Sequence, residues 1–242
     1  MKKTTLFLCV MFLFFTFSNV ALANLVTNGD FEDGTATVPF RDAFTLGSSA
    51  FGEWYAQSNW DVLPGGRTGA GDDFAMHILG TGDDQKLFQP IDTSAFDTTG
   101  AGLDFDFYAK FLEPDTGNPG ALRVGLVGLS GAGAQYKSYG GSTIDGNYGS
   151  NTVLWTGSLT EWPSGDPDQW VHWTISTLTF SQNFDAIVVS FAGNGWLVGD
   201  GAFQAIDDVN LTISVPEPAT LLLLGTGFLG FVVVGRKKFF KK

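Results

Sequence analysis

Residues 103–111 read Leu103-Asp104-Phe105-Asp106-Phe107-Tyr108-Ala109-Lys110-Phe111, and this alternation decides the fold class. Apolar residues occupy every second position, while Asp104, Asp106 and Lys110 lie between them. Because successive side chains of a β-strand point to opposite faces, the stretch predicts a strand with one buried and one solvent-facing side. The same period recurs near the end of the chain, in Phe203, Ala205, Asp207, Val209, Leu211 and Ile213.

Further strands are expected at residues 74–79, 86–91, 122–129, 173–180 and 184–191, with Trp60 and Trp173 in the core. Glycine-, serine- and asparagine-rich loops are expected at residues 112–120, 130–151 and 193–202. No long stretch repeats apolar residues at helical spacing. Regularly spaced strands with turn signals between them predict an all-β protein with a single β-sandwich.

The C-terminal tail has three parts of different chemistry. Pro216, Glu217 and Pro218 come first, and residues 219–235 then carry no charge. A helix over this run would span roughly 26 Å, close to the thickness of a membrane core. Residues 236–242 are basic and include Arg236, Lys237 and Lys238, which predicts that this end stays cytoplasmic. We therefore expect a transmembrane helix at 219–235 and a basic tail at 236–242.

This order of parts, with Val215-Pro216-Glu217-Pro218-Ala219-Thr220 at its start, resembles the PEP-CTERM sorting signal of Gram-negative bacteria. The resemblance covers residues 215–242 and implies recognition by an exosortase, which would cut near the Pro-Glu-Pro motif. It also implies a membrane-anchored precursor that ends at the cell surface or in the extracellular exopolysaccharide matrix, as in a biofilm. An ordinary C-terminal membrane anchor is the alternative.

The N-terminus predicts export by a secretory signal peptide over residues 1–23. Its parts are a basic start, an apolar run and a small-x-small cleavage site, at Lys2-Lys3, Leu6–Phe17 and Ala21-Leu22-Ala23. Cys9 is the only cysteine and lies inside this segment, so the mature chain has neither a disulfide nor a thiolate metal site. Residues 24–214 remain, a length that suits one β-sandwich domain.

Charge narrows the range of partners for residues 24–214. Of 13 basic and 25 acidic residues, the two termini hold seven basic residues and Glu217, which leaves 6 basic and 24 acidic residues and a net charge of −18. Such a surface repels nucleic acid and anionic lipid. Twenty of these acids are Asp. Short carboxylates in glycine-rich turns suit Ca²⁺, although Asp also favours turns through local hydrogen bonds.

A second resemblance covers the whole of this region. The start Asn24-Leu25-Val26-Thr27-Asn28-Gly29-Asp30-Phe31-Glu32 and the finish Phe203-Gln204-Ala205-Ile206-Asp207-Asp208-Val209-Asn210-Leu211 look like the first and last strands of galactose-binding-like jelly rolls. That fold is used by many carbohydrate-binding modules. The resemblance implies that the first and last strands are neighbours, with a structural Ca²⁺ where they meet. Its ligands would be Glu32 and Asp207, with Asp208, Asp72 and Asp73 as weaker candidates. Alternatively, Asp207 accepts backbone N–H bonds or stays at the rim of the sandwich.

The family also binds sugars, which dock on flat aromatic faces beside planar polar groups. Trp162, Tyr139 and Trp196 lie in segments with loop composition and are the candidate sugar platforms. Aromatic residues of a sandwich are more often buried packing, which is the alternative for each of them.

Catalysis has little support in the sequence. His77 and His172 have no partner visible in the sequence, and no nucleophile, metalloprotease or phosphate-loop motif is present. We therefore expect a non-enzyme that binds carbohydrate, sorted with the help of the secretion machinery and an exosortase. A structural matrix protein without specific glycan binding is the alternative, and a glycoside-active enzyme using Glu161 is a distant third.

Overall fold

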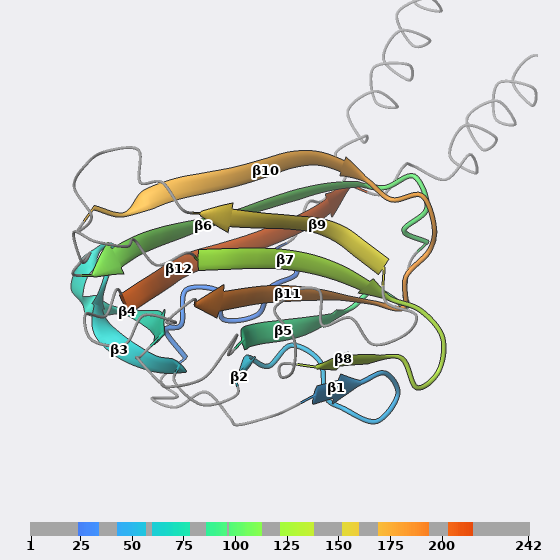
Figure 1. The fold of residues 1–242 in the computed structure, drawn as a ribbon, viewed down its shortest axis with the longest axis horizontal. Coiled ribbons are helices and arrows are strands. Elements are labelled where there is room, and N and C mark those ends of the chain that lie inside the picture. Colours follow the sequence, from blue (N-terminus) through green and yellow to red (C-terminus); the bar gives the residue numbers. More distant parts are fainter. Residues whose placement is uncertain are drawn as a thin grey trace, which may run out of the picture. The chain divides into compact units, whose positions relative to one another are not determined.

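A computed structural model describes residues 24–33, 43–56, 60–77, 86–95, 97–112, 122–137, 152–159, 169–193 and 203–214 (Figure 1). Residues Ala23–Ile213 group into one compact unit. The expected signal peptide and the whole C-terminal sorting signal lie outside the described residues. In the described part of the chain, no helix is long and apolar enough to cross a membrane.

All regular structure in these ranges is β-strand, as expected. The strands are β1 (Ala43–Thr45), β2 (Tyr55–Ala56), β3 (Trp60–Gly66), β4 (Gly69–His77), β5 (Lys86–Asp92), β6 (Gly102–Leu112), β7 (Leu122–Leu129), β8 (Gln135–Lys137), β9 (Thr152–Leu159), β10 (Val171–Thr179), β11 (Ala186–Gly193) and β12 (Phe203–Ser214). They form one five-stranded sheet in the order β10-β6-β12-β4-β3, here called the first sheet, and a second in the order β2-β5-β11-β7-β9. A short pair, β1 and β8, forms a third sheet below β5 in Figure 1.

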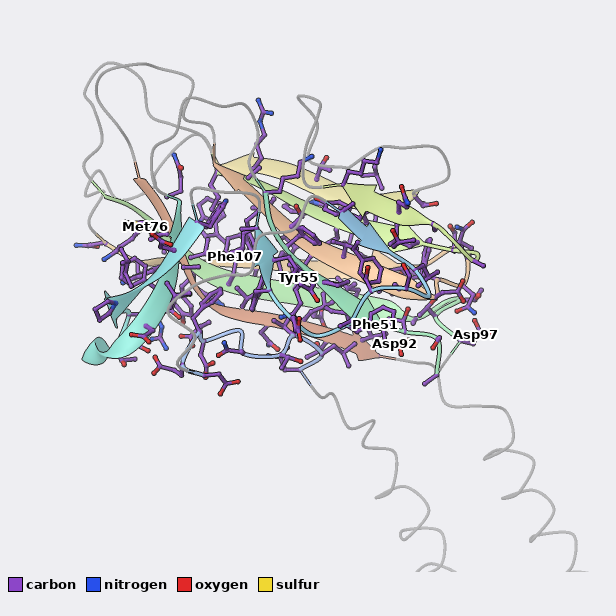
Figure 2. The ribbon with its side chains drawn as sticks, turned by 90° about the horizontal axis from the view of Figure 1, so that it is seen from below. Phe51, Tyr55, Met76, Asp92, Asp97 and Phe107 are labelled. Carbon is purple, nitrogen blue, oxygen red and sulfur yellow. The ribbon has the colours of Figure 1, made fainter. Side chains whose placement is uncertain are left out.

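The alternation in β6 produces the core as predicted. Leu103, Phe105, Phe107 and Ala109 are at most 1% exposed, whereas the residues between them face outward. The ring of Phe107 meets that of Phe191 at 5.1 Å, edge to face. Because Phe191 belongs to β11, this contact joins the two sheets. Figure 2 shows Met76 near one end of the sandwich and Asp92 and Asp97 near the other, with Phe107 between them.

The second sheet is covered on its outer side as well. Phe44 of β1 and Tyr136 of β8 are fully buried and belong to one apolar cluster with Phe88 and Val188. The Tyr136 hydroxyl donates a hydrogen bond to Ser190 Oγ. This cover explains why β11 is buried on both faces, and it leaves the outer face of the first sheet as the more open one.

Five strands were not expected from the sequence: β1, β2, β3, β8 and β9. The expectation of a loop over 130–151 is wrong at β8, which forms because it pairs with β1. Strand β3 carries Pro64 and Gly65 and forms by antiparallel pairing with β4, from Trp60 opposite His77 onward. Strand β9 pairs with β7. Strand β4 also begins at Gly69, earlier than expected. Trp60 is buried, as predicted for a core residue, while Trp173 is half-buried.

Gly128 of β7 gives the first testable prediction. A Cβ atom there would lie 2.3 Å from Cδ1 of the buried Phe184 ring, so alanine would have to displace the ring. We expect Gly128→Ala to lower the free energy of unfolding by about 2 kcal/mol, the usual cost of overpacking. Gly71→Ala is the control, since nothing lies within 4 Å of its Cβ position. Equal urea midpoints for the two variants would contradict the close packing at Gly128.

Candidate functional site

The N-terminal segment 24–29 lies along β12. The N–H of Leu25 donates to the Leu211 carbonyl, and the N–H of Val209 donates to the Gly29 carbonyl, both at 2.8 Å. A Cβ at position 29 would lie 2.1 Å from the Val209 carbonyl oxygen, so only glycine allows this approach. The beginning and the end of the domain are therefore neighbours, as the jelly-roll resemblance implied. The expected first strand is not formed, because residues 24–33 adopt turns and irregular backbone.

A groove of about 520 Å³ opens beside this segment on the outer face of the first sheet. The N-terminal segment forms one wall, and outward-facing residues of β6, β10 and β12 form the rest. Its lining residues are Asn24, Val26, Asn28, Gly29, Asp30, Asp106, Tyr108, His172, Asp208, Val209 and Asn210.

Tyr108 is the centre of the groove's aromatic part. The His172 ring stacks on it with the centroids 4.5 Å apart and an interplanar angle of 16°. The Arg67 guanidinium carbon lies 4.3 Å from the same Tyr108 centroid. His172 comes from β10 on one side of β6, whereas Arg67 is paired with Asp208 of β12 on the other side, so the Tyr108 ring lies between them. Cation–π attraction adds to the packing of this stack.

Carboxylates fix the rest of the groove. One oxygen of Asp106 lies 3.0 Å from His172 Nε2, and the other accepts a 3.0 Å hydrogen bond from Asn210 Nδ2. Arg67 forms a 2.5 Å ion pair with Asp208. Because each of these polar side chains is held by a hydrogen bond or ion pair to a neighbour, the groove presents a preformed set of donors and acceptors.

Asp207 lies next to the groove but is completely buried. Burial raises the pKa of this carboxyl from 3.8 to about 7, and the nearby charges of Asp208 and Asp72 add to the rise. Its oxygens accept the N–H of Arg67 at 3.0 Å and the N–H of Asp208 at 2.7 Å, which works in the opposite direction. The alternative from the sequence, in which Asp207 accepts backbone N–H bonds, is therefore observed.

The turn between β3 and β4 collects the other acids. Glu32 Oε1 accepts the Asp73 N–H at 2.5 Å, which lowers its pKa, but the hydrogen bond with Asp72 and desolvation outweigh this and raise the pKa of Glu32. Burial acts against ionisation of Asp72, yet hydrogen bonds from the Thr68 N–H and hydroxyl hold its pKa below the usual value. Asp207 and Asp72 both lie 3.0 Å from the position of a Cβ on Gly66.

These acids suit Ca²⁺ by chemistry, since they offer only oxygen donors. Across the ranges that the structure covers, no group of three His, Cys, Asp or Glu side chains is placed so as to hold a metal ion.

The residues predicted from sequence divide into three groups. Glu32, Asp72, Asp73 and Asp207 come together around the β3–β4 turn, whereas Asp208 turns to Arg67 and lines the groove. Trp162, Tyr139 and Trp196 lie outside the described residues, as do Pro216, Glu217 and Pro218.

The groove itself was missed by sequence reasoning. The sequence places Asp106 on the solvent side of its strand and shows no partner for His172. The available signal was the run of outward-facing polar and aromatic residues in β6, but the strand opposite it could not be identified.

Comparisons with known proteins find one sequence motif and several solved structures that are similar to parts of this chain. Residues 214–238 match the PEP-CTERM protein-sorting motif. No curated protein matches the chain. Among solved structures, the Stig cyclase Fisc from Fischerella sp. TAU, in complex with (3Z)-3-(1-methyl-2-pyrrolidinylidene)-3H-indole, has a TM-score of 0.50 at 14% identity, covering 81% of this chain and 99% of that one.

Two carbohydrate-binding modules are also similar. TmCBM61 in complex with β-1,4-galactotriose has a TM-score of 0.40 at 14% identity, covering 78% of this chain and 97% of that one. The C-terminal family 22 module of Clostridium thermocellum Xyn10B has a TM-score of 0.41 at 19% identity, covering 69% and 90%. The chain thus carries an all-β sandwich that is similar to the jelly rolls of carbohydrate-binding modules. A PEP-CTERM sorting motif follows it in the sequence and implies export and exosortase processing.

Proposed function

We propose that the protein is sorted by an exosortase to the cell surface or extracellular matrix, where its sandwich binds a saccharide in the groove over β6, β10 and β12. The observation that carries the proposal is the groove's preformed chemistry. Asp106, Asn210 and His172 form a connected set of planar polar groups around 520 Å³ of open volume. Planar donors and acceptors held in place suit the hydroxyl groups of a sugar.

The aromatic contact in this proposal differs from the one expected in the loops. Both faces of the Tyr108 ring are occupied, so a sugar would meet the edge of Tyr108 and the outer side of His172, whose side chain is 45% exposed. Trp162, Tyr139 and Trp196 remain the predicted platforms outside the described residues.

The structural Ca²⁺ also remains a proposal. Glu32, Asp72 and Asp207 would hold it at the junction of the N-terminal segment, β12 and the β3–β4 turn. Like charges crowd there, which is the condition that a bound cation relieves. Its role would be to tie both ends of the domain together in a protein without disulfides.

Affinity electrophoresis of residues 24–214 through gels loaded with a polysaccharide panel tests the binding proposal. We expect retardation by at least one polysaccharide, and an affinity about tenfold weaker for His172→Ala, the loss of roughly one good hydrogen-bonded contact. Thr174→Ala is the matched control, because Thr174 is exposed on the same face of β10 two residues away.

The outcomes separate the candidate sites and functions. Weakening only by Trp162→Ala, Tyr139→Ala or Trp196→Ala would move the site to the predicted loops. Unretarded migration in every gel would favour a structural matrix protein. Release of reducing sugar would instead indicate an enzyme.

A further inference from the structure

We infer that the groove selects saccharides that carry free amino groups over neutral and acidic ones. The inference rests on the proposed function, because it assigns a ligand class to the same groove. It comes from the balance of charges that line the groove and from how each of them is held.

Three carboxylates line the groove, those of Asp30, Asp106 and Asp208. The guanidinium of Arg67 reaches the groove through its contact with Tyr108 and is already paired with Asp208 at 2.5 Å. One ion pair therefore cancels, and the carboxylates of Asp30 and Asp106 remain. A protonated His172 would still leave three negative groups against two positive ones.

The two remaining carboxylates differ in how firmly they are held. Asp106 is fixed between His172 and Asn210, so its charge stays at the floor of the groove. Asp30 is exposed on the wall, where one oxygen accepts a long 3.5 Å hydrogen bond from the Glu32 N–H. Both carboxylates line the same groove, so an ammonium group bound there would be attracted by both.

The surroundings reinforce this preference. The acids of the β3–β4 turn lie close to the groove, because Arg67 of this turn donates its N–H to Asp207 and also contacts Tyr108 in the groove. In addition, residues 24–214 carry a net charge of −18. Concave sites lined by one sign of charge concentrate ligands of the opposite sign. A uronic acid or sulfated sugar would be repelled, a neutral sugar would gain only hydrogen bonds, and an amino sugar would gain charge-assisted ones.

The test is calorimetric titration of the full chain, held in a polyoxyethylene detergent that contains no sugar. The probes are tetramers of glucosamine, N-acetylglucosamine, glucose and galacturonic acid. At pH 6.5 an amine that titrates like a peptide α-amino group, with a pKa of about 7.7, is mostly protonated. We expect the glucosamine tetramer to bind about tenfold more tightly than the glucose tetramer, and the galacturonate tetramer to bind most weakly.

Charge-matched variants separate the groove from the acidic surface as a whole. Asp30→Asn is expected to weaken the glucosamine tetramer about threefold to fivefold and to leave the glucose tetramer nearly unchanged. Asp104→Asn removes the same charge from an exposed position of β6 outside the groove lining and is expected to change neither.

Equal weakening by both variants would overturn the inference, because the attraction would then belong to the surface in general. Preference for the glucose or galacturonate tetramer would also overturn it while leaving the proposed saccharide binding intact. Absence of heat with all four tetramers, together with free migration through the polysaccharide gels, would remove the proposed function as well.

Discussion

In the presence of a chelator, the stability of residues 24–214 relative to the Asp207→Asn variant is expected to fall by up to about 4 kcal/mol between pH 4 and pH 8. The cause is the buried Asp207 carboxyl, whose pKa is raised from 3.8 to about 7 by burial. Each unit of such a shift corresponds to about 1.4 kcal/mol.

The direction follows from proton binding. Between pH 3.8 and pH 7 the folded protein keeps a proton on Asp207 that the unfolded chain has released. Unfolding therefore releases a proton, and a rise in pH favours the unfolded state. Below this window both states are protonated and the cost is absent; above it both are ionised and the full cost remains. The lowered pKa of Asp72 acts in the opposite sense, but its stabilisation is lost only as the pH falls below about 4.

Urea unfolding of the wild type and Asp207→Asn at pH 4, 5.5, 7 and 8.5 measures the effect. The difference between the two proteins cancels the titration of groups distant from Asp207. Asp104→Asn, with its exposed carboxyl, should run parallel to the wild type. Parallel curves for Asp207→Asn would show that Asp207 does not carry a raised pKa.

The fold class could be predicted because apolar and polar residues alternate along β6 and β12, and this alternation directly indicates which side chains are buried. Leu103, Phe105 and Phe107 alternate with polar residues, and this period survives whatever the strand pairs with. Strand β3 could not be predicted in this way. Pro64 and Gly65 have little intrinsic preference for strands, and it is pairing with β4 that extends this segment.

The two parts of the candidate site differ for a related reason. The acids near the β3–β4 turn were accessible from the sequence because the resemblance places the first and last strands side by side. The groove depends on sheet register. His172 lies opposite Tyr108 only because β10 pairs with β6 in that register, and the two residues are 64 positions apart in the chain. No local pattern records such a pairing.

Calcium is expected to raise the melting temperature of residues 24–214 at pH 8, and chelator to lower it. An ion present at about 100 times its dissociation constant adds roughly 2.7 kcal/mol of stability, which is a rise of about 5–10 °C for a domain of this size. Mg²⁺ should do much less, since it demands a small octahedral shell that flexible carboxylates rarely provide.

Two variants test whether the proposed ligands are involved. Asp207→Asn and Glu32→Gln should each abolish most of the calcium-dependent rise, because each removes a charged oxygen donor. Asp104→Asn should keep the full rise. If the wild type and Asp207→Asn melt alike with calcium and with chelator, the proposed ion site is wrong, and the acids of the turn serve only as hydrogen-bond acceptors.

The calcium response should itself depend on pH, and this dependence ties the two predictions to one residue. A carboxylate must lose its proton to bind a cation, so Ca²⁺ competes with the proton that Asp207 holds up to about pH 7. The rise in melting temperature should therefore be small at pH 5 and full at pH 8. Calcium would then remove most of the loss of stability expected above pH 7 in chelator. A calcium effect of equal size at both pH values would place the ion on carboxylates other than Asp207.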